Sequence, residues 1–222
     1  MEAANIGGPG AREADVAPAV EPTGGRLAAW TPADPGPLGL AAFAGTTFLL
    51  SLVNGNLISG PVTDLPVVLG VALAYGGIAQ FAAGLWEFRT GNTFGAVAFC
   101  SYGAFWISFY FLVRQGVPEL AKNPAHLNHA LGAYLWMWGI FTTYMFIASL
   151  RTTGAIALVF LLLAATFIIL GIGNSAGNLS TIKVGGYVGL ATAIAAWYAS
   201  FAAVMNSTFG RVVAPVFPLR RV

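Results

Sequence analysis

The stretch AIALVFLLLAATFIILGIG, residues 155–173, carries no charged side chain over its whole length. An α-helix rises about 1.5 Å per residue, so this stretch nearly covers the ~30 Å hydrocarbon core of a bilayer. Because lipid offers no hydrogen-bond partner to a backbone amide, a segment that crosses it must be helical. The stretch therefore predicts a transmembrane helix.

Five further apolar runs of similar length appear on both sides of this segment when a window of about 19 residues is moved along the chain. Breaks that contain Gly, Pro or Asn separate them, for example Gly60-Pro61 and Gly91-Asn92. We therefore expect an all-α membrane protein, built as a bundle of six transmembrane helices. The six predicted spans are residues 38–58, 66–86, 93–113, 130–150, 155–173 and 183–204.

The composition agrees with lipid as the main solvent of this chain. Hydrophobic residues make up 57% of the sequence and charged residues 8%, too few to cover a soluble fold of 222 residues. The net charge is only +2, and the basic residues are scattered except for Arg220 and Arg221, so no basic stripe is available for nucleic acid. The single Cys100 excludes an intrachain disulfide and a cysteine metal site.

Two tails flank the predicted bundle of residues 38–206. Residues 1–37 are rich in Ala, Gly and Pro and lack the apolar core of a signal peptide, so we expect a disordered cytoplasmic tail. Residues 207–222 are expected to form a short cytoplasmic C-terminal tail. With both termini inside, seven Lys and Arg side chains are cytoplasmic and three are outside: Arg114, Lys122 and Lys183. This distribution predicts a multi-pass protein of the plasma membrane with both termini cytoplasmic.

No ionisable side chain lies at the centre of a predicted span, whereas ion pumps, proton relays and voltage sensors place such groups there. The sequence also offers no paired carboxylates, no nucleophile with a base and no metal cluster, so we do not expect an enzyme. His126 and His129 fall in the connection before the fourth span and are expected to be solvated loop residues. We expect no metal and no cofactor.

Uncharged polar side chains recur in and beside the spans instead. Hydroxyl and amide groups can replace part of a solute's hydration without trapping the solute, as conduction requires. They can equally serve as hydrogen bonds between helices, and this alternative stays open for each of them. The candidate substrate path consists of Thr46, Thr47, Asn54, Gln80, Asn92, Ser101 and Asn174.

Two segments weakly resemble each other: TTFLLSLVNGNL at residues 46–57 and ATFIILGIGNSAGNL at residues 165–179. Each places Thr-Phe one to two turns before a break rich in Asn and Gly. Paired breaks mark the substrate path in transporters that are built from repeats. So short a match could also arise by chance.

Glycines are expected to bring helices close together. Gly185, Gly189 and Ala193 form a small-residue ridge at a spacing of four, which lets a neighbouring backbone approach. The adjacent Gly76 and Gly77 weaken a helix interior. They predict either a tight crossing or a locally opened backbone.

Four blocks of the chain carry a resemblance to a known family. DPGPLGLAAFAGTT at residues 34–47 resembles the Asn-Pro-Ala-Pro-Leu-Gly-Leu signature that opens the acetate uptake transporter family, also called the GPR/FUN/YaaH family, which includes the bacterial succinate-acetate permeases. YGGIAQFAAGLWEFRTGNTFGAVAFCSYGAFW at residues 75–106 is similar to that family over its whole length, and residues 160–174 and 206–211 match as well. The signature positions are Asp34, Pro35, Pro37, Leu38, Gly39 and Leu40.

The resemblance implies a six-helix subunit that assembles as a homo-hexamer, with a separate pore in each subunit. It implies passage of acetate and, in some members, succinate, by channel-like flow or proton-linked uptake. The hydrophobic constriction of the family falls on Phe43, Tyr102 and Leu163 by motif position. Such a ring would admit a methyl group, and the Tyr102 hydroxyl would offer one hydrogen bond to a carboxylate.

Two positions depart from the family pattern. Asp34 stands where the signature has Asn, and Ser207 stands where the family has Glu after Asn206. Both changes alter the charge expected at the cytoplasmic mouth. Two alternatives to carboxylate transport remain: a channel for a small neutral solute such as urea or ammonia, and a membrane sensor or scaffold without flux.

Overall fold

The computed structural model describes residues 30–58 and 61–219, with only the backbone for residues 61–64. Within these residues six helical segments are long and apolar enough to cross a membrane. An isolated bridge between Thr153 and Pro218 is the only β-type pairing in the described part of the chain. The prediction of an all-α, six-span membrane protein is therefore confirmed.

Four spans are single α-helices and two are composite. The single helices are α1 (Gly36–Asn54), α6 (Pro124–Ser149), α7 (Gly154–Ser175) and α8 (Leu179–Phe209). The second span joins α2 (Pro61–Val71), the π-helix η1 (Ala72–Ala79) and α3 (Gln80–Thr90). The third joins α4 (Thr93–Phe111), the π-helix η2 (Leu112–Gly116) and α5 (Val117–Leu120).

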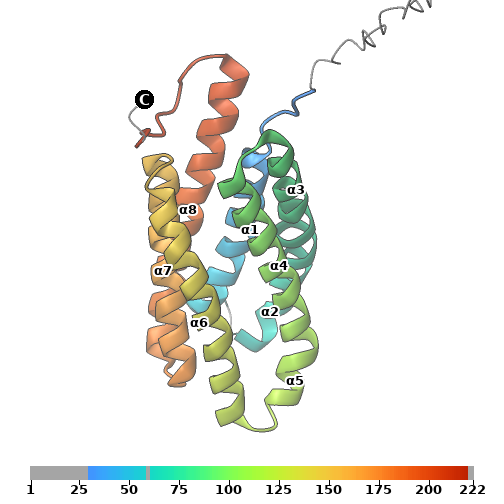
Figure 1. The fold of residues 1–222 in the computed structure, drawn as a ribbon. Helices are drawn as coiled ribbons and strands as arrows, with labels where there is room; N and C mark the ends of the chain where they lie inside the picture. Colours follow the sequence, from blue (N-terminus) through green and yellow to red (C-terminus); the bar gives the residue numbers. More distant parts are fainter. Residues whose placement is uncertain (1–29, 59–60, 220–222) are drawn as a thin grey trace, which may run out of the picture. The chain divides into compact units, whose positions relative to one another are not determined.

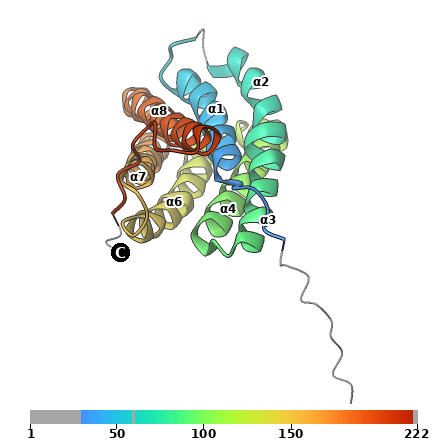
Figure 2. The same cartoon turned by 90° about the horizontal axis from the view of Figure 1, so that it is seen from above.

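The spans run side by side along one axis and form a ring when seen along it (Figures 1 and 2). On one arc α1 packs against α8, α8 against α7 and α7 against α6, and on the other α1 packs against η1 and α3, which pack against α4. The ring closes between α4 and α6, whose backbones make few direct contacts. α1 begins and α8 ends at the same side of the bundle, which we name the N/C side; α5 lies at the opposite side (Figure 1).

The boundaries of the spans differ from the hydropathy estimate where polar residues begin a helix. α6 begins at Pro124, because the Asn123 side chain caps it by accepting a hydrogen bond from the His126 amide at 3.4 Å. His126 and His129 are therefore exposed residues of a helix, and their prediction as loop residues was wrong. α8 likewise continues to Phe209, past the predicted end of the bundle at residue 206.

Gly76 and Gly77 produce both effects that the sequence left open, a locally opened backbone and a tight crossing between helices. They lie in η1, whose widened π-turn is an opened form of the helix backbone. A Cβ atom on Gly76 would lie 2.6 Å from the Thr46 hydroxyl oxygen and 2.8 Å from Cδ1 of Trp106. The second span thus crosses α1 and α4 at a distance that only glycine permits.

The small-residue ridge of α8 packs as expected. A Cβ atom on Gly185 would lie 2.6 Å from Leu170 of α7, and one on Gly189 would overlap the Ser51 hydroxyl of α1. Gly186, which the predicted ridge did not include, faces the backbone nitrogen of Gly55 with no room for a Cβ atom. These contacts hold α8 against the last turns of α1 and α7.

After α8 the chain turns back at Gly210, which has φ +62°, and residues 210–219 run to the start of α7. The Asn206 side chain accepts hydrogen bonds from the amides of Val213 (2.7 Å) and Ala214 (2.9 Å) and donates one to the Ala214 carbonyl (2.9 Å). The Leu219 amide donates to the Thr152 carbonyl at 3.0 Å. This part of the predicted C-terminal tail is thus tied to the bundle, while residues 1–29 and 220–222 lie outside the described residues.

Candidate solute pathway

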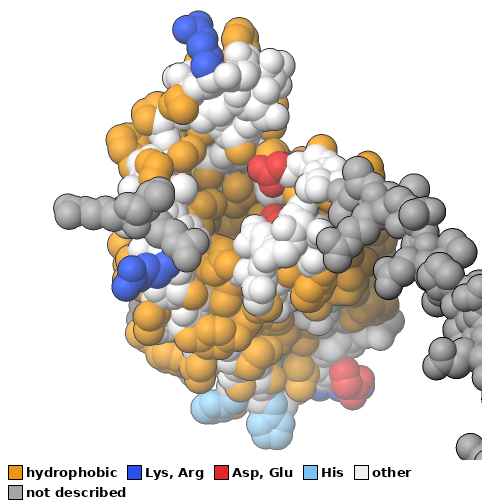
Figure 3. Space-filling model, turned by 45° about the horizontal axis from the view of Figure 1, so that its top comes forward, with side chains coloured by type: hydrophobic (Ala, Val, Ile, Leu, Met, Phe, Trp, Pro, Cys, Tyr) orange, Lys and Arg blue, Asp and Glu red, His pale blue; other side chains and the backbone are white. Residues whose placement is uncertain are grey.

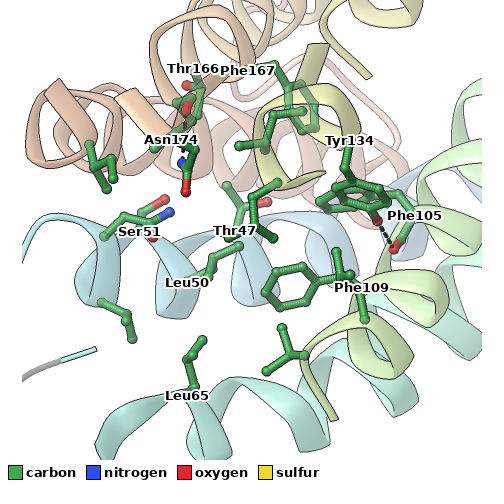
Figure 4. A pocket seen from close by; sticks show the side chains of 18 of the residues that line it. Thr47, Leu50, Ser51, Leu65, Phe105, Phe109, Tyr134, Thr166, Phe167 and Asn174 are labelled. Atoms are coloured by element: carbon green, nitrogen blue, oxygen red, sulfur yellow. Dashed lines mark hydrogen bonds between the residues drawn. The ribbon is translucent and has the colours of Figure 1, made fainter. Parts of the chain in front are cut away.

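A cavity of about 410 Å³ lies inside the ring, toward the side opposite the N/C side (Figure 4). Its size falls within the range of ligand-binding cavities, about 300–1,000 Å³. The wall comes mainly from α1, α4, α6, α7 and α8, and α2, η2 and α5 add Leu65, Leu112, Val113 and Val117. Most of it is apolar, with aromatic rings such as Phe105 and Phe167, and Thr47, Ser51, Asn54, Thr166 and Asn174 interrupt it.

A second, smaller cavity of about 20 Å³ lies on the N/C side of the first and is lined by Leu40, Gln80 and Phe99 among others. Phe43 and Leu163 line both cavities, so they lie between them. Tyr102 borders the smaller cavity, and its ring centroid is 5.7 Å from that of Phe43. The structure thus brings the three residues of the predicted constriction together, with Phe43 and Leu163 between the two cavities.

The Tyr102 hydroxyl is already occupied in this arrangement. It lies 2.9 Å from the Thr142 hydroxyl oxygen, and Thr142 itself donates to the Trp138 carbonyl at 2.7 Å. Because the Thr142 proton is used, Tyr102 must donate to Thr142. The sequence analysis expected the Tyr102 hydroxyl to donate to a carboxylate, but here its proton is used in the bond to Thr142. Tyr102 therefore contributes its ring to the wall of the small cavity.

Of four buried side-chain polar atoms without a hydrogen-bond partner among the described residues, two are the indole nitrogens of Trp106 and Trp138, and two are oxygens. One oxygen is the hydroxyl oxygen of Thr47, in the wall of the large cavity, and the other is Oε1 of Gln80, in the wall of the small one. The other buried helix threonines donate to the carbonyl four residues earlier: Thr46, Thr142, Thr166 and Thr192. An unpaired buried polar atom costs free energy, so a partner such as water or a solute is expected at each of these two oxygens.

Asn54 and Asn174, the asparagines of the two similar segments, line the same cavity. Asn174 points from α7 toward the α1 side chains around Ser51 (Figure 4). Its Nδ2 donates to the Leu170 carbonyl at 2.8 Å, which leaves Oδ1 and the second amide proton for another partner. The Asn- and Gly-rich ends of the two similar segments therefore border the same cavity.

Three residues of the predicted path line neither cavity. The Thr46 hydroxyl donates to the Ala42 carbonyl at 2.9 Å, and Asn92 caps α4 by accepting from the Gly95 amide at 3.1 Å. Ser101 is half-buried on α4. Thr46 and Asn92 make contacts that stabilise helices, and a role for any of the three in the path stays a prediction.

Ser51 lines the large cavity and was missing from the predicted path. Thr47, Ser51 and Asn54 are spaced by four and three residues, which places them on one face of α1. A search for polar residues at helical spacing would have found this stripe.

The signature positions hold the start of α1 in place. The Pro37 carbonyl accepts a hydrogen bond from the Ser200 hydroxyl of α8 at 2.7 Å. A Cβ atom on Gly39 would lie 2.7 Å from the Phe99 ring of α4, so glycine lets these helices meet. Pro35 is buried next to the first turn, Leu40 borders the small cavity, and Leu38 is exposed.

Two carboxylates lie at the N/C side of the pathway. Asp34 is exposed and accepts a hydrogen bond from the Gly36 amide at 2.8 Å, while Glu87 is buried and accepts from Asn92 (2.9 Å) and Thr90 (3.1 Å). A Cβ atom added at Gly36 would lie 3.0 Å from Asp34 Oδ1 and 3.6 Å from Glu87 Oε1, so both carboxylates face the same small space. Figure 3 shows a hollow with apolar walls on this side and acidic side chains beside it.

The ring of six spans defines a multi-pass helical membrane protein, and the two cavities inside it share Phe43 and Leu163 in their walls. The sequence model of the GPR1/FUN34/yaaH family matches residues 19–221. The chain belongs to this family, as the signature and the long block at residues 75–106 predicted.

The chain is similar to named relatives and to a solved structure. It is 42% identical over 197 residues to acetate permease A of Emericella nidulans, covering 83% of this chain and 65% of that protein. It is 41% identical over 184 residues to succinate-acetate/proton symporter SatP of Escherichia coli, covering 83% of this chain and 95% of that protein. The solved structure of the bacterial acetate channel SatP matches with a TM-score of 0.76 at 40% identity, covering 83% of this chain and 99% of that one. The chain thus spans less than two thirds of the fungal relative's length.

Proposed function

We propose that this protein conducts acetate and related short-chain carboxylates, succinate among them, across the plasma membrane. The names of the similar proteins support this substrate class. One structural observation carries the proposal: Phe43 and Leu163 lie between two cavities, and the wall of each cavity contains a buried oxygen, of Thr47 or of Gln80, without a partner among the described residues.

The wall chemistry fits a solute with one polar end and one apolar end. A methyl group passes the rings of Phe43 and Tyr102 without losing a hydrogen bond, whereas a carboxylate needs a new partner on each side. The Thr47 hydroxyl can donate to it in the large cavity. The Gln80 amide can accept the O–H of a protonated acid through Oε1, or rotate and donate to an anion.

Channel-like flow and proton-linked uptake differ in what carries the charge. Among the described residues that line the two cavities, Lys183 is the one charged side chain, and it lies at the open end. A proton that crosses the constriction would therefore travel on the acid itself. Simultaneous recording of acetate flux and current in one reconstituted preparation separates the two, because anion flow carries current and movement of the neutral acid does not.

The proposal includes a homo-hexamer with one pathway per subunit and both termini cytoplasmic. Large exposed apolar side chains such as Ile140, Ile147 and Ile194 suit contact with lipid or with neighbouring subunits. The count of Lys and Arg along the sequence, seven inside against three outside when both termini are cytoplasmic, supports the orientation. The molecular mass of the detergent-solubilised protein and protease access in sealed vesicles test these two points.

Uptake of labelled acetate into proteoliposomes tests the main proposal. We expect uptake above that of protein-free vesicles at several pH values, inhibited by excess unlabelled acetate and not by urea. Inhibition by urea alone would favour a neutral-solute channel, and uptake equal to that of empty vesicles would favour a sensor or scaffold. No catalytic step is part of this proposal.

A further inference from the structure

We infer that Lys183 is a specificity-determining residue, which holds the second carboxylate of a dicarboxylate at the open end of the large cavity. This inference rests on the proposed function and names the side chain that favours dianions over monoanions. It begins from the composition of the wall: of the described residues that line this cavity, Lys183 alone carries a charge.

The packing of α8 brings Lys183 close to the two asparagines. Gly186 touches the backbone at Asn54 and Gly55, and Lys183 lies three residues earlier on the same face of α8. A spacing of three residues is about 4.5 Å along a helix axis. Ile182, the neighbour of Lys183, packs against Gly173, directly before Asn174. Lys183, Asn54 and Asn174 therefore lie at the same end of the cavity.

The Lys183 ammonium has no carboxylate within ion-pair distance among the described side chains. The ion pair that these side chains do form, Lys122 with Glu119 at 2.6 Å, is exposed and outside the cavity wall. Lys183 is itself exposed, so its ammonium is hydrated and can meet an anion at the mouth without first leaving another partner.

These groups offer two separate points of contact to a four-carbon dicarboxylate. One carboxylate reaches the amides of Asn54 and Asn174, which are neutral and bind a carboxylate of any acid. The other carboxylate meets the Lys183 ammonium, a contact that a monocarboxylate bound at the amides lacks. The aliphatic carbons between them lie against the apolar wall. A dianion therefore gains more from Lys183 than acetate does.

Inhibition of acetate uptake by succinate in proteoliposomes tests this inference. In Lys183→Met we expect the succinate concentration for half-inhibition to rise about tenfold, and the half-saturating acetate concentration to rise about threefold or less. Lys183→Arg should restore most of the succinate inhibition. Lys122→Met is the matched control, a lysine on the same side of the membrane that lies outside the cavity, and it should behave as the unaltered protein does.

Ionic strength provides a readout that needs no variant. Raising the salt concentration should weaken succinate inhibition of the unaltered protein more than it weakens acetate uptake, and this difference should vanish in Lys183→Met. Succinate inhibition that is unchanged in Lys183→Met, or changed equally in Lys122→Met, would overturn the role of Lys183. Absence of acetate uptake by the unaltered protein would instead overturn the proposed function, so the two failures are distinguishable.

Discussion

The two ends of the pathway differ in both volume and charge. The large cavity, about 410 Å³, has Lys183 at its open end and neutral amides and hydroxyls along its wall. The small cavity, about 20 Å³, lies toward the N/C side, where Asp34 and Glu87 face one space. A positive charge marks one end of the path, and two carboxylates mark the other.

This difference shows where an anion is favoured and where it is not. The end with Lys183 attracts a carboxylate over the distance that ionic screening permits, about 8 Å in physiological salt. At the N/C end the carboxylates would repel it, and in the proposed function the Gln80 amide would be its partner near the constriction. An anion is therefore attracted at the end with Lys183 and repelled at the end with Asp34 and Glu87. Single substitutions can change the strength of either effect.

Gln80→Glu would extend the negative end of the path to the constriction, and it is expected to have the largest effect. Gln80 is buried, so an added carboxyl group, once it is ionised, would repel a passing anion with little screening. We expect acetate uptake to fall about 100-fold, which corresponds to about 2.7 kcal/mol. Gln80→Met, similar in size and uncharged, is the control and should cost only a few-fold; equal losses in both variants would contradict this account.

Phe43→Ala would merge the two cavities and so remove the boundary between the two ends. The Phe43 ring packs at 5.7 Å from that of Tyr102, and its loss removes a side chain that lies between the two cavities. We expect uptake of an acid larger than acetate, such as butyrate, to rise about tenfold relative to acetate, equivalent to about 1.4 kcal/mol. Phe48→Ala is the matched control, because Phe48 lies on the same helix, packs against Trp197 of α8 and lines neither cavity.

Thr47→Val tests whether the unpartnered hydroxyl serves the solute. Its oxygen makes no hydrogen bond to the described residues, so we expect acetate uptake to fall about fivefold, as for one lost hydrogen bond, without loss of thermal stability. Thr46→Val is the comparison, because the Thr46 hydroxyl donates to Ala42 and lines neither cavity. It should lower stability slightly and leave uptake unchanged. If Thr46→Val lowered uptake and Thr47→Val did not, Thr46 would belong to the path and Thr47 would not.

Asp34→Asn would weaken the contrast between the two ends and is expected to have the smallest effect. Asp34 is exposed, so water and salt screen its charge. We expect acetate flux to rise about twofold at low ionic strength and to match the unaltered protein at about 0.15 M salt. A large loss of flux at every salt concentration would show that Asp34 mainly holds α1 in place through its bond to the Gly36 amide.

Hydropathy predicted the number of spans because each one must be apolar over most of its length. It missed the start of α6, where Pro124 and His126 lower the apolar average although Asn123 caps a helix there. It also treated residues 66–86 as one regular helix, whereas a π-helix interrupts them. The Gly76-Gly77 pair indicated an irregularity, but sequence periodicity does not place Thr46 and Trp106, which pack against Gly76.

The candidate site was predicted only in part. Phe43, Tyr102 and Leu163 came from motif positions, and the structure places them together. The polar residues came from their positions within or beside spans, so residues that face other helices, such as Thr46, were grouped with Thr47, which faces the cavity. Which of two adjacent threonines faces a solute depends on helix rotation, and that is set by contacts such as Gly76 against Thr46.

The segment that turns back after α8 has a mechanical consequence. Its backbone bonds at Thr152 and Gly154 run antiparallel to the start of α7, and Asn206 fixes its other end. When the protein is pulled from a membrane by its C-terminal end, the force first reaches these few bonds. Residues 210–219 would peel away before α8 leaves the bilayer, adding about 30 Å of extended chain at about 3.3 Å per residue. A force–extension record should show this early, low-force step before the first helix is extracted.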